Sequence, residues 1–367
     1  MALEKYGIAY TRISHTTSSS SQNASNLEEM PAHLRAFTER ELTKAMKVTK
    51  ATRIGDGSFG NVSKTVVKSL QHPKHHIKVA VRRYTSRNQV EQTYQEYATQ
   101  TYQEYATQVK VLGAINHPNI VKLIGYVEDN VQMLVYEYMP NNSVFHHLYS
   151  SNTTPLSWNM RLKVAHDVAR GIAYLHEASN FQVILGDFSS SNILLDENWN
   201  AKLADIRVAP HPNEVKNFLR KMHYVDPYKP PEYFMTVTTP MSNVWSYGVF
   251  LYELITGPRP KDTNRSKGED ALVEWVKPYV KTRDFISIID PRLGAVYSME
   301  SVEKLSNIAK RCLAINPEMR PKMSEVLNMV SEIVASVSNT LEYPKKDDHP
   351  IKGNMKKWSF RALFCFK

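Results

Sequence analysis

The chain has 367 residues, of which 42% are hydrophobic, so it is long enough to bury a large core in one domain with tails. Its formal charge of +10 favours contact with acidic partners or anionic surfaces, but no nucleic-acid-binding module accompanies that charge. Its two cysteines lie far apart in sequence and no apolar run is long enough to span a bilayer, which argues against a disulfide-rich secreted protein and a membrane-spanning one.

Residues 1–36 are expected to form a disordered leader. The polar run at residues 14–26 contains no large apolar residue, so it cannot offset its ordering entropy by burying hydrophobic surface. The alternative is that part of the leader docks on the folded domain. The next segment, residues 37–46, predicts a short helix on the first lobe, because its apolar residues recur with helical spacing: Phe37, Leu42, Ala45 and Met46.

A glycine-rich turn follows at residues 54–62, between runs that read as strands. Its glycines, Gly55, Gly57 and Gly60, have no Cβ, so the backbone can approach a phosphate group closely. On its own such a turn is a weak signal. Residues 77–81 predict the next strand.

The sequence of residues 93–100 is repeated without change at residues 101–108. Two copies do not make a repeat architecture, which needs at least three. If both copies are helical, the insertion adds about 12 Å to a helix, so the first copy is expected to extend that helix at its start. The rival interpretation is an error in the assembled sequence or gene model.

From Trp158 onward the hydrophobic pattern is helical. Residues 161–176 predict a long amphipathic helix, and residues 302–337 predict a helical pair. The expected fold class is therefore α+β, with a small β-rich lobe followed by a large helical lobe. Basic and aromatic residues then alternate in a tail at residues 338–367.

Two motifs in the second half of the chain resemble parts of protein kinases. Residues 185–196 are similar to the catalytic loop, and residues 204–207 are similar to the D-F-G segment. The chain resembles the plant receptor-like cytoplasmic kinases, particularly subfamily VII, across about residues 37–337, and its most specific matches are residues 272–279, 289–293 and 320–327. The resemblance implies a two-lobed kinase-like fold, with a first lobe at about 37–139 and a second at about 140–337.

The resemblance also implies a site for ATP and Mg²⁺. Asp187 would accept the proton of the substrate hydroxyl, and Asn192 and Asp205 would hold the metal. The residues implied in nucleotide binding are Gly55, Gly57, Gly60, Val62, Ala80, Arg82, Glu137, Met139 and Leu194. For the apolar members of this set, ordinary core packing is an equally good explanation.

At five positions the chain departs from the family pattern. Arg82 replaces the lysine that binds the α- and β-phosphates, and its planar fork does not reproduce a compact ammonium. Gln108 stands where the glutamate partner of that lysine is expected, and the two could share a hydrogen bond. Gly186 and Ser189 replace an arginine and a lysine of the catalytic loop, and Arg207 replaces the glycine of D-F-G.

Lys78 is an alternative candidate for the missing cation, although four residues place it about 13 Å from Arg82 along the strand. Glu104 is an alternative candidate for the carboxylate, although a solvated helix face explains it as well, just as an exposed strand arginine is another explanation of Arg82. Asn243 replaces an aspartate that braces the catalytic loop in the family. The residues that stabilise the scaffold are kept. Glu232 and Arg320 match a buried ion pair, and aliphatic residues fill the four places of a hydrophobic stack between the lobes: Leu112, Leu123, Leu185 and Ile206.

The resemblance and the departures together predict a catalytically impaired, kinase-like signalling scaffold or decoy that binds ATP and Mg²⁺ weakly and works in plant receptor or immune signalling. The alternative is a weakly active ATP-dependent serine/threonine kinase that uses Asp187, Asn192 and Asp205. The expected partners are receptor kinases or immune receptors, and no nucleic acid.

The expected location is the cytoplasm, with peripheral contact to the plasma membrane. Basic residues near anionic lipid and aromatic residues at the interface would bind the tail at residues 350–367 to a membrane, and Cys365 could carry an acyl chain. The other interpretation is a disordered tail that folds onto the large lobe.

Overall fold

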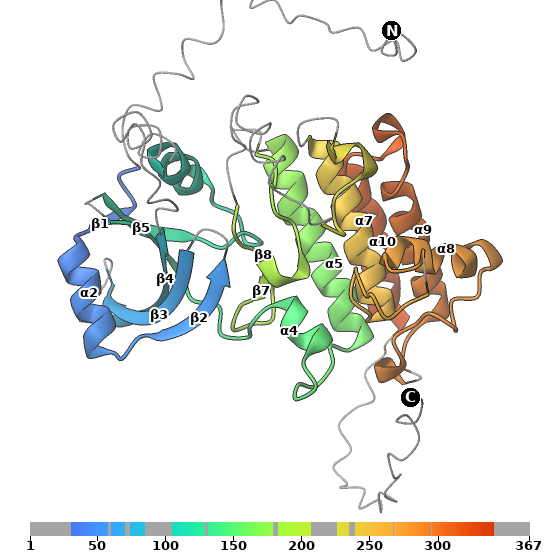
Figure 1. Ribbon diagram of the computed structural model, residues 1–367, viewed down its shortest axis with the longest axis horizontal. Helices are drawn as coiled ribbons and strands as arrows, with labels where there is room; N and C mark the ends of the chain where they lie inside the picture. The colour runs from blue at the N-terminus through green and yellow to red at the C-terminus, as the bar shows by residue number, and fades with distance from the viewer. Residues whose placement is uncertain are drawn as a thin grey trace, which may run out of the picture.

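The computed structural model describes residues 31–57, 60–69, 74–84, 105–128, 131–178, 183–206, 226–234, 239–266, 268–294 and 296–340, and the account below concerns these residues. They form two lobes, a sheet-rich one at the left of Figure 1 and a helical one at the right. The predicted α+β fold, with the small β-rich lobe first and the large helical lobe second, is confirmed.

The first lobe is built on a six-stranded sheet in the order β1-β5-β6-β4-β3-β2. β1 and β5 pair in parallel, and the other neighbouring strands are antiparallel. The predicted strand at residues 77–81 is confirmed as part of β4. The strands are β1 (Arg35–Phe37), β2 (Thr52–Gly57), β3 (Gly60–Lys68), β4 (His76–Tyr84), β5 (Leu123–Glu128) and β6 (Gln132–Glu137).

The folded domain begins before residue 37. Arg35 and Ala36 already belong to β1, and the preceding Leu34 is buried. The predicted leader boundary at residue 36 is therefore a few residues too late, because these residues hydrogen-bond to the edge of the sheet at β5. Residues 1–30, with the polar run, lie outside the described residues.

The helix predicted at residues 37–46 is confirmed as α2 (Glu39–Val48), which packs on one face of the sheet. It begins after Thr38, whose hydroxyl accepts a hydrogen bond from the backbone N–H of Glu41. Leu42 is fully buried between helix and sheet. Phe37 does not lie on the helix as predicted; it belongs to β1, because the helix starts only after its cap.

A helix at residues 105–114 precedes β5. The hydroxyl of Tyr105 lies 2.7 Å from the carbonyl oxygens of both Val127 and Met133, so this helix is hydrogen-bonded to two strands. Of the repeated sequence, residues 105–108 are described and are helical. The first copy, residues 93–100, lies outside the described residues.

The second lobe is a group of helices around α7. A short hairpin, β7 (Ile193–Leu195) with β8 (Ala201–Leu203), lies between this group and the first lobe (Figure 1). The predicted helix at residues 161–176 is confirmed as α5 and the turn after it, and the predicted pair at 302–337 as α9 and α10. The helices are α4 (Val144–Tyr149), α5 (Trp158–Ala173), α7 (Pro240–Thr256), α8 (Leu272–Thr282), α9 (Met299–Cys312) and α10 (Met323–Thr340).

α7 is buried from Ser242 to Thr256, and local signals set both of its ends. Thr239 and Ser242 form a capping box at its start, where Pro240 occupies the first turn. Gly257 ends it with a φ of +80°, and a Cβ at this position would lie 2.5 Å from the carboxylate of Asp290. Glycine is therefore required here both by the backbone conformation and by the close approach.

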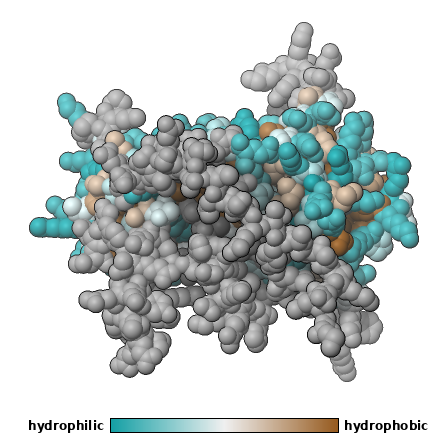
Figure 2. Space-filling model, turned by 90° about the horizontal axis from the view of Figure 1, so that it is seen from above, coloured by the Kyte–Doolittle hydropathy of each residue, from teal (hydrophilic) through white to brown (hydrophobic). Residues whose placement is uncertain are grey.

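The described surface is mostly hydrophilic in the view from above, with hydrophobic residues in scattered patches (Figure 2). None of the helices in the described part of the chain is both long enough and apolar enough to cross a membrane. The tail, with residues 350–367, lies outside that part.

Candidate active site

The residues expected to hold phosphate and metal meet where the two lobes join. Arg82 comes from β4 of the first lobe, and Asp205 follows β8 of the second. An Arg82 Nη1 and an Asp205 Oδ1 form an ion pair, with 12% and 8% of the two side chains exposed. Asp205 has a φ of 54°, a left-handed conformation that is uncommon for residues other than glycine. The residue in the place of the expected lysine is thus bonded to the expected metal ligand.

The helix at residues 105–114 is joined to the same segment. The Gln108 side-chain nitrogen donates a hydrogen bond of 3.3 Å to the carbonyl oxygen of Ile206, the residue after Asp205. We expected that Arg82 and Gln108 could share a hydrogen bond. In the structure Arg82 pairs with Asp205 instead, and Gln108 bonds to the backbone of Ile206. Glu104, the alternative carboxylate, and Arg207 lie outside the described residues.

The catalytic-loop residues Asp187 and Asn192 lie just before β7. The Asn192 side-chain nitrogen donates to the backbone carbonyl of Asp187 at 3.0 Å. The backbone N–H of Ala204 donates to the carbonyl of Asn192 at 2.8 Å. These two bonds connect Asp187, Asn192 and the segment that carries Asp205, so the three predicted catalytic residues share one hydrogen-bonded unit.

Asn243 on α7 still braces this loop, although we expected the brace to be lost with the aspartate. Its amide oxygen accepts a hydrogen bond of 2.9 Å from the backbone N–H of Leu185, and its nitrogen donates one of 2.7 Å to the Leu185 carbonyl. His176 also lies 3.1 Å from that oxygen, and burial lowers the pKa of this imidazole. An amide can replace the carboxylate because the partners are a neutral donor and a neutral acceptor.

Lys229 contacts the catalytic loop at Gly186, and the sequence analysis did not predict this contact. Its ammonium donates a hydrogen bond to the Gly186 carbonyl and lies 4.0 Å from the carboxylate of Asp226. Only 10% of its side chain is exposed, and the ammonium lies 4.9 Å from the centre of the Tyr233 ring. Burial raises the pKa of Asp226, and the nearby charge of Asp187 raises it further. Lys229 thus places a cation beside the catalytic loop, in which Gly186 and Ser189 replace the two basic residues of the family pattern.

The signal for Lys229 was present in the sequence. It stands three residues before Glu232, which the sequence analysis assigns to an ion pair of the scaffold, so a second charged residue beside it could have been considered. The neighbouring Tyr228 is buried, so its hydroxyl is not accessible.

A fully buried carboxylate links three parts of the second lobe. Glu253 on α7 accepts hydrogen bonds of 2.5 Å from the hydroxyls of Tyr149, Ser190 and Tyr228. Burial raises the pKa of Glu253 to about 7, although these three hydroxyls oppose the shift. The carboxylate therefore joins α4, the catalytic loop and the segment of Lys229.

The remaining predicted nucleotide residues lie on strands and at the junction between the lobes. Val62 pairs with Arg82 in the sheet, and Ala80 pairs with Tyr136. Leu194 lies on β7 of the second lobe and forms an isolated antiparallel bridge with Ser143. Gly55 and Gly57 of β2 pair with Val62 and Gly60 of β3, while the tip between them, residues 58–59, is not described. Met139 is buried.

The side chain of Glu137 is engaged with protein groups. Its carboxylate binds the ammonium of Lys202 at 2.8 Å and the backbone N–H of Lys122 at 2.8 Å. Any contact of this residue with a nucleotide would therefore use the backbone. The assignment of the nucleotide residues as a set stays a prediction.

The scaffold contacts predicted from the sequence are present. Arg320 and Glu232 form a two-pronged ion pair with N–O distances of 2.6 and 2.9 Å, and the arginine side chain is completely buried. The four residues of the predicted hydrophobic stack are each at most 5% exposed and belong to one core cluster: Leu112, Leu123, Leu185 and Ile206. The predicted ion pair is confirmed, and the burial of the four residues agrees with the predicted stack.

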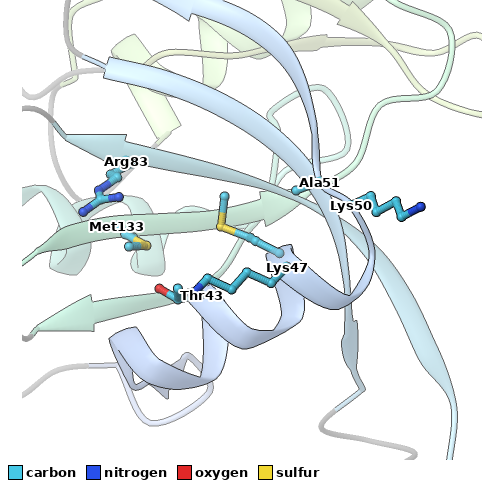
Figure 3. A pocket seen from close by; sticks show the side chains of 7 residues that line it. Thr43, Lys47, Lys50, Ala51, Arg83 and Met133 are labelled. Atoms are coloured by element: carbon cyan, nitrogen blue, oxygen red, sulfur yellow. The ribbon is translucent and has the colours of Figure 1, made fainter.

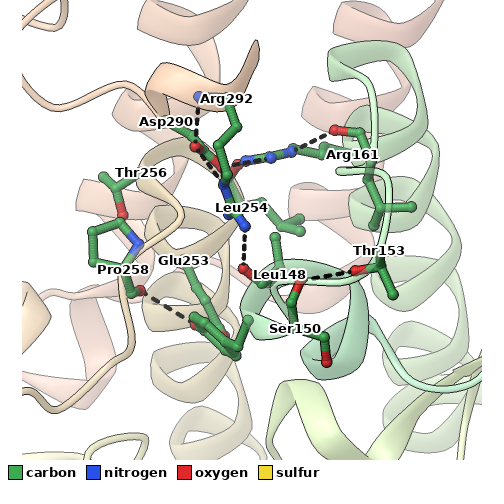
Figure 4. Close-up of polar contacts among 12 residues, drawn as sticks. Leu148, Ser150, Thr153, Arg161, Glu253, Leu254, Thr256, Pro258, Asp290 and Arg292 are labelled. Atoms are coloured by element: carbon green, nitrogen blue, oxygen red, sulfur yellow. Dashed lines mark hydrogen bonds and ion pairs between the residues drawn. The ribbon is translucent and has the colours of Figure 1, made fainter. Parts of the chain in front are cut away.

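A second buried ion cluster holds α5 against the end of α7 (Figure 4). The Arg161 guanidinium binds the Asp290 carboxylate at 2.6 Å and the carbonyl of Leu254 at 2.8 Å. Arg292 binds the same carboxylate at 2.7 Å and the carbonyl of Leu148 at 2.5 Å. The two arginines hold the pKa of Asp290 below its usual value despite its burial. The motif at residues 289–293 therefore has a structural role, the pairing of Asp290 with two arginines, that the sequence alone did not indicate.

Comparison with known proteins identifies the family that the chain resembles. The family model of protein tyrosine and serine/threonine kinases matches residues 48–330. Among curated proteins, the serine/threonine-protein kinases PCRK2 and PCRK1 of Arabidopsis thaliana are each 44% identical, over 88% and 89% of this chain and 77% and 79% of their own lengths. Receptor-like cytoplasmic kinase 176 of Oryza sativa subsp. japonica is 35% identical over 82% of this chain and 77% of its own.

Proposed function

Since this chain belongs to the family of protein tyrosine and serine/threonine kinases, we propose that it is a catalytically impaired member that works by binding other proteins, as a scaffold or decoy in plant receptor or immune signalling. Phosphoryl transfer depends on positioning and on neutralising the charge of the transferred group. In this chain the groups that supply positive charge have changed, whereas the groups that hold the fold together have not.

The observation that carries this proposal is the ion pair between Arg82 and Asp205. It occupies both the cation expected to hold the nucleotide phosphates and the carboxylate expected to hold the metal. The catalytic loop lacks two further cations, at Gly186 and Ser189. With these changes the developing charge on the transferred phosphoryl group has little to stabilise it, and such stabilisation is usually the largest single contribution to catalysis.

The second candidate function is weak serine/threonine kinase activity. It is favoured by one observation, the hydrogen-bonded unit that keeps Asp187, Asn192 and the segment of Asp205 together. Lys229 adds a cation beside Asp187 that a kinase could use. In our reading its bond to a backbone carbonyl holds the loop.

A radiolabel transfer assay separates the two functions. The purified chain is incubated with γ-labelled ATP and Mg²⁺, alone and with a generic protein substrate, beside an Asp187→Ala variant. We expect no transfer above the level of the variant. Transfer that disappears in Asp187→Ala would refute the scaffold proposal and establish the kinase. A variant that combines Arg82→Lys, Gly186→Arg and Ser189→Lys tests whether the lost cations suffice to restore transfer.

A basic hollow of about 410 Å³ on the first lobe supports contact with an acidic partner. It lies between α2 and the sheet, with Met46 and Met133 among its lining residues and Lys47 and Arg83 supplying positive charge. Figure 3 shows Lys47 extending toward Thr43. Met46 is half-buried and lies beside these cations, which suits a partner segment that is both apolar and acidic, while Met133 is buried and forms the floor. Glu39 lies 3.9 Å from Arg83 and offsets part of the charge.

We propose that the partners are receptor kinases or immune receptors of the same signalling system, and that the protein works in the cytoplasm beside the plasma membrane. The support for the membrane is the sequence of the tail, in which lysines and arginine alternate with aromatic residues. Liposomes with anionic lipid should retain the full chain and release a chain without residues 350–367. Equal retention of both would remove the membrane from the proposal.

A further inference from the structure

Two ion pairs among the described residues cross the junction between the lobes. The first joins Arg82 of β4 to Asp205, with 12% and 8% of the two side chains exposed. The second joins Glu137, the last residue of β6, to Lys202 of β8, with N–O distances of 2.8 and 3.0 Å. In each pair one partner belongs to the sheet of the first lobe and the other to the segment that begins with β8 (Figure 1).

We propose that these two pairs form an interlobe lock, which holds the lobes in one orientation through residues of the chain itself. The lock is a conformational device that goes beyond the proposed function, because it does not depend on whether the chain transfers phosphate. Its consequence is that a partner contacting both lobes meets their surfaces in a fixed arrangement.

The two pairs have opposite polarity, which makes the arrangement specific. The first lobe supplies the cation Arg82 and the anion Glu137. The second lobe supplies the anion Asp205 and the cation Lys202. A slide or turn of one lobe that exchanged the partners would bring like charges together, and such a contact is costly where little water screens it. One relative position of the lobes therefore satisfies both pairs.

The spacing of the charges also matches on the two lobes. In the sheet Glu137 lies opposite Val79, and Arg82 follows Val79 by three residues, so the two charges are about 10 Å apart along the strands. On the other side, Lys202 and Asp205 are three residues apart as well. A single pair would allow the lobes to turn about it, whereas two separate points of attachment prevent this turn.

Hydrogen bonds to the backbone position the charged groups. The Glu137 carboxylate accepts one of 2.8 Å from the N–H of Lys122. The Gln108 side chain, on the helix at residues 105–114, donates one of 3.3 Å to the carbonyl of Ile206, the neighbour of Asp205. Pairs that are mostly buried are screened little by salt, so we expect the lock to hold at high ionic strength as well.

The hydrophobic stack crosses the same junction, but apolar contact is not directional and does not by itself set an orientation. The family uses ATP together with Mg²⁺. Such a ligand would move the lobes only if its differential affinity for a second orientation exceeded the cost of breaking the pairs. We therefore expect the lobe orientation to be independent of nucleotide.

The experiment measures the distance between the lobes in the full chain by double electron–electron resonance. Spin labels are attached at Lys44→Cys on α2 and Lys281→Cys on α8, two exposed positions in different lobes. Cys365 is replaced by serine. Cys312 stays, because it is buried and burial raises the pKa of its thiol to about 12. We expect one narrow distance distribution that Mg²⁺ and ATP leave unchanged.

Three variants test the contribution of the charges. Lys202→Met removes one pair and should widen the distribution about twofold, because the lobes can then turn about the other pair. Lys202→Arg keeps the charge and should retain the narrow distribution. Lys163→Met is the matched control, since it breaks an ion pair with the same N–O distance of 2.8 Å that lies within the second lobe, and it should leave the distribution unchanged.

Three results would overturn the lock: a broad distribution in the unaltered chain, a shift of its maximum with Mg²⁺ and ATP, or equal widths in Lys202→Met and Lys163→Met. Thermal melts show whether each variant is folded, and Lys202→Gln replaces Lys202→Met, with the same expectation, if the latter is not. The outcome is separate from the transfer assay. Phosphate transfer with a narrow distribution refutes the scaffold proposal and leaves the lock, and a broad distribution without transfer does the reverse.

Discussion

The replacement of Arg320 by alanine tests whether the kinase scaffold is maintained independently of the chemistry. This guanidinium is fully buried and binds both oxygens of Glu232, whose side chain is 20% exposed. It also donates to the carbonyls of Ala314, Met241 and Ile315. The alanine variant would therefore leave one carboxylate and three carbonyl groups without this partner.

Breaking a buried ion pair costs about 3 to 5 kcal/mol, because the remaining charge is left without compensation. Partial exposure of Glu232 lowers this cost, whereas each carbonyl that stays buried without a partner raises it by about 1 to 3 kcal/mol, so we take about 3 to 5 kcal/mol as a conservative range. A domain of about 300 residues has an unfolding entropy of roughly 0.6 kcal/mol/K, at about 2.1 cal/mol/K per residue. The midpoint of thermal unfolding should then fall by about 5 to 8 °C.

The assay is a set of calorimetric melts at matched pH, concentration and scan rate. Asp187→Ala is the comparison, because this half-buried side chain lies on the catalytic loop and should shift the midpoint by less than about 2 °C. Arg320→Lys is a second one, since it keeps the charge and loses the two-pronged bond. If the Arg320→Ala and Asp187→Ala variants unfold at the same temperature, the ion pair contributes nothing, and the idea of a preserved scaffold loses its main support.

Three other predictions concern buried charge. Asp290→Ala leaves Arg161 and Arg292 without their shared carboxylate, so the free energy of unfolding should fall by about 3 to 5 kcal/mol in a denaturant titration. The control is Glu274→Ala, which removes an exposed ion pair and should cost less than about 1 kcal/mol. For Glu253 the folded pKa of about 7 exceeds the ordinary 4.5, so the native state holds the proton more tightly, and unfolding free energy should fall by up to about 3 kcal/mol as pH rises from about 4.5 to 7. Glu253→Gln should lack this decline, and an equal slope in both proteins would refute the assignment. Lys229→Ala removes the bond to the catalytic loop, so amide hydrogen exchange at Gly186 and its neighbours should accelerate about fivefold, for a loss of about 1 kcal/mol of local stability; unchanged exchange would mean that the lysine does not hold the loop.

Much of the candidate site could be located from the sequence. Asp187, Asn192 and Asp205 occupy short motifs, and the structure joins their backbone segments by hydrogen bonds. The motifs identified these residues but did not show which side chain each of them contacts. Arg82 was expected near Gln108, yet its ion pair is with Asp205, 123 residues later. Partners of opposite charge attract across the junction of the lobes, and no window of sequence contains both.

The same limit explains Asn243. From the sequence, the exchange of a carboxylate for an amide reads as the loss of a brace. In the structure the partners are the N–H and carbonyl of one residue, Leu185, and an amide satisfies both. Whether a substitution removes a contact depends on the groups that face it, and only the tertiary structure supplies them.

The sequence by itself determined the order of the lobes, the helices near residues 37–46, 161–176 and 302–337, and the strand at residues 77–81. These features depend on hydrophobic periodicity and on capping residues, which act within a few turns or a few residues. The tertiary structure alone decided where the domain begins, that Lys229 reaches the catalytic loop, and that the Arg82 guanidinium holds the Asp205 carboxylate. These contacts join segments distant in the chain, and they form because a charge that leaves water must find a partner wherever packing has placed one.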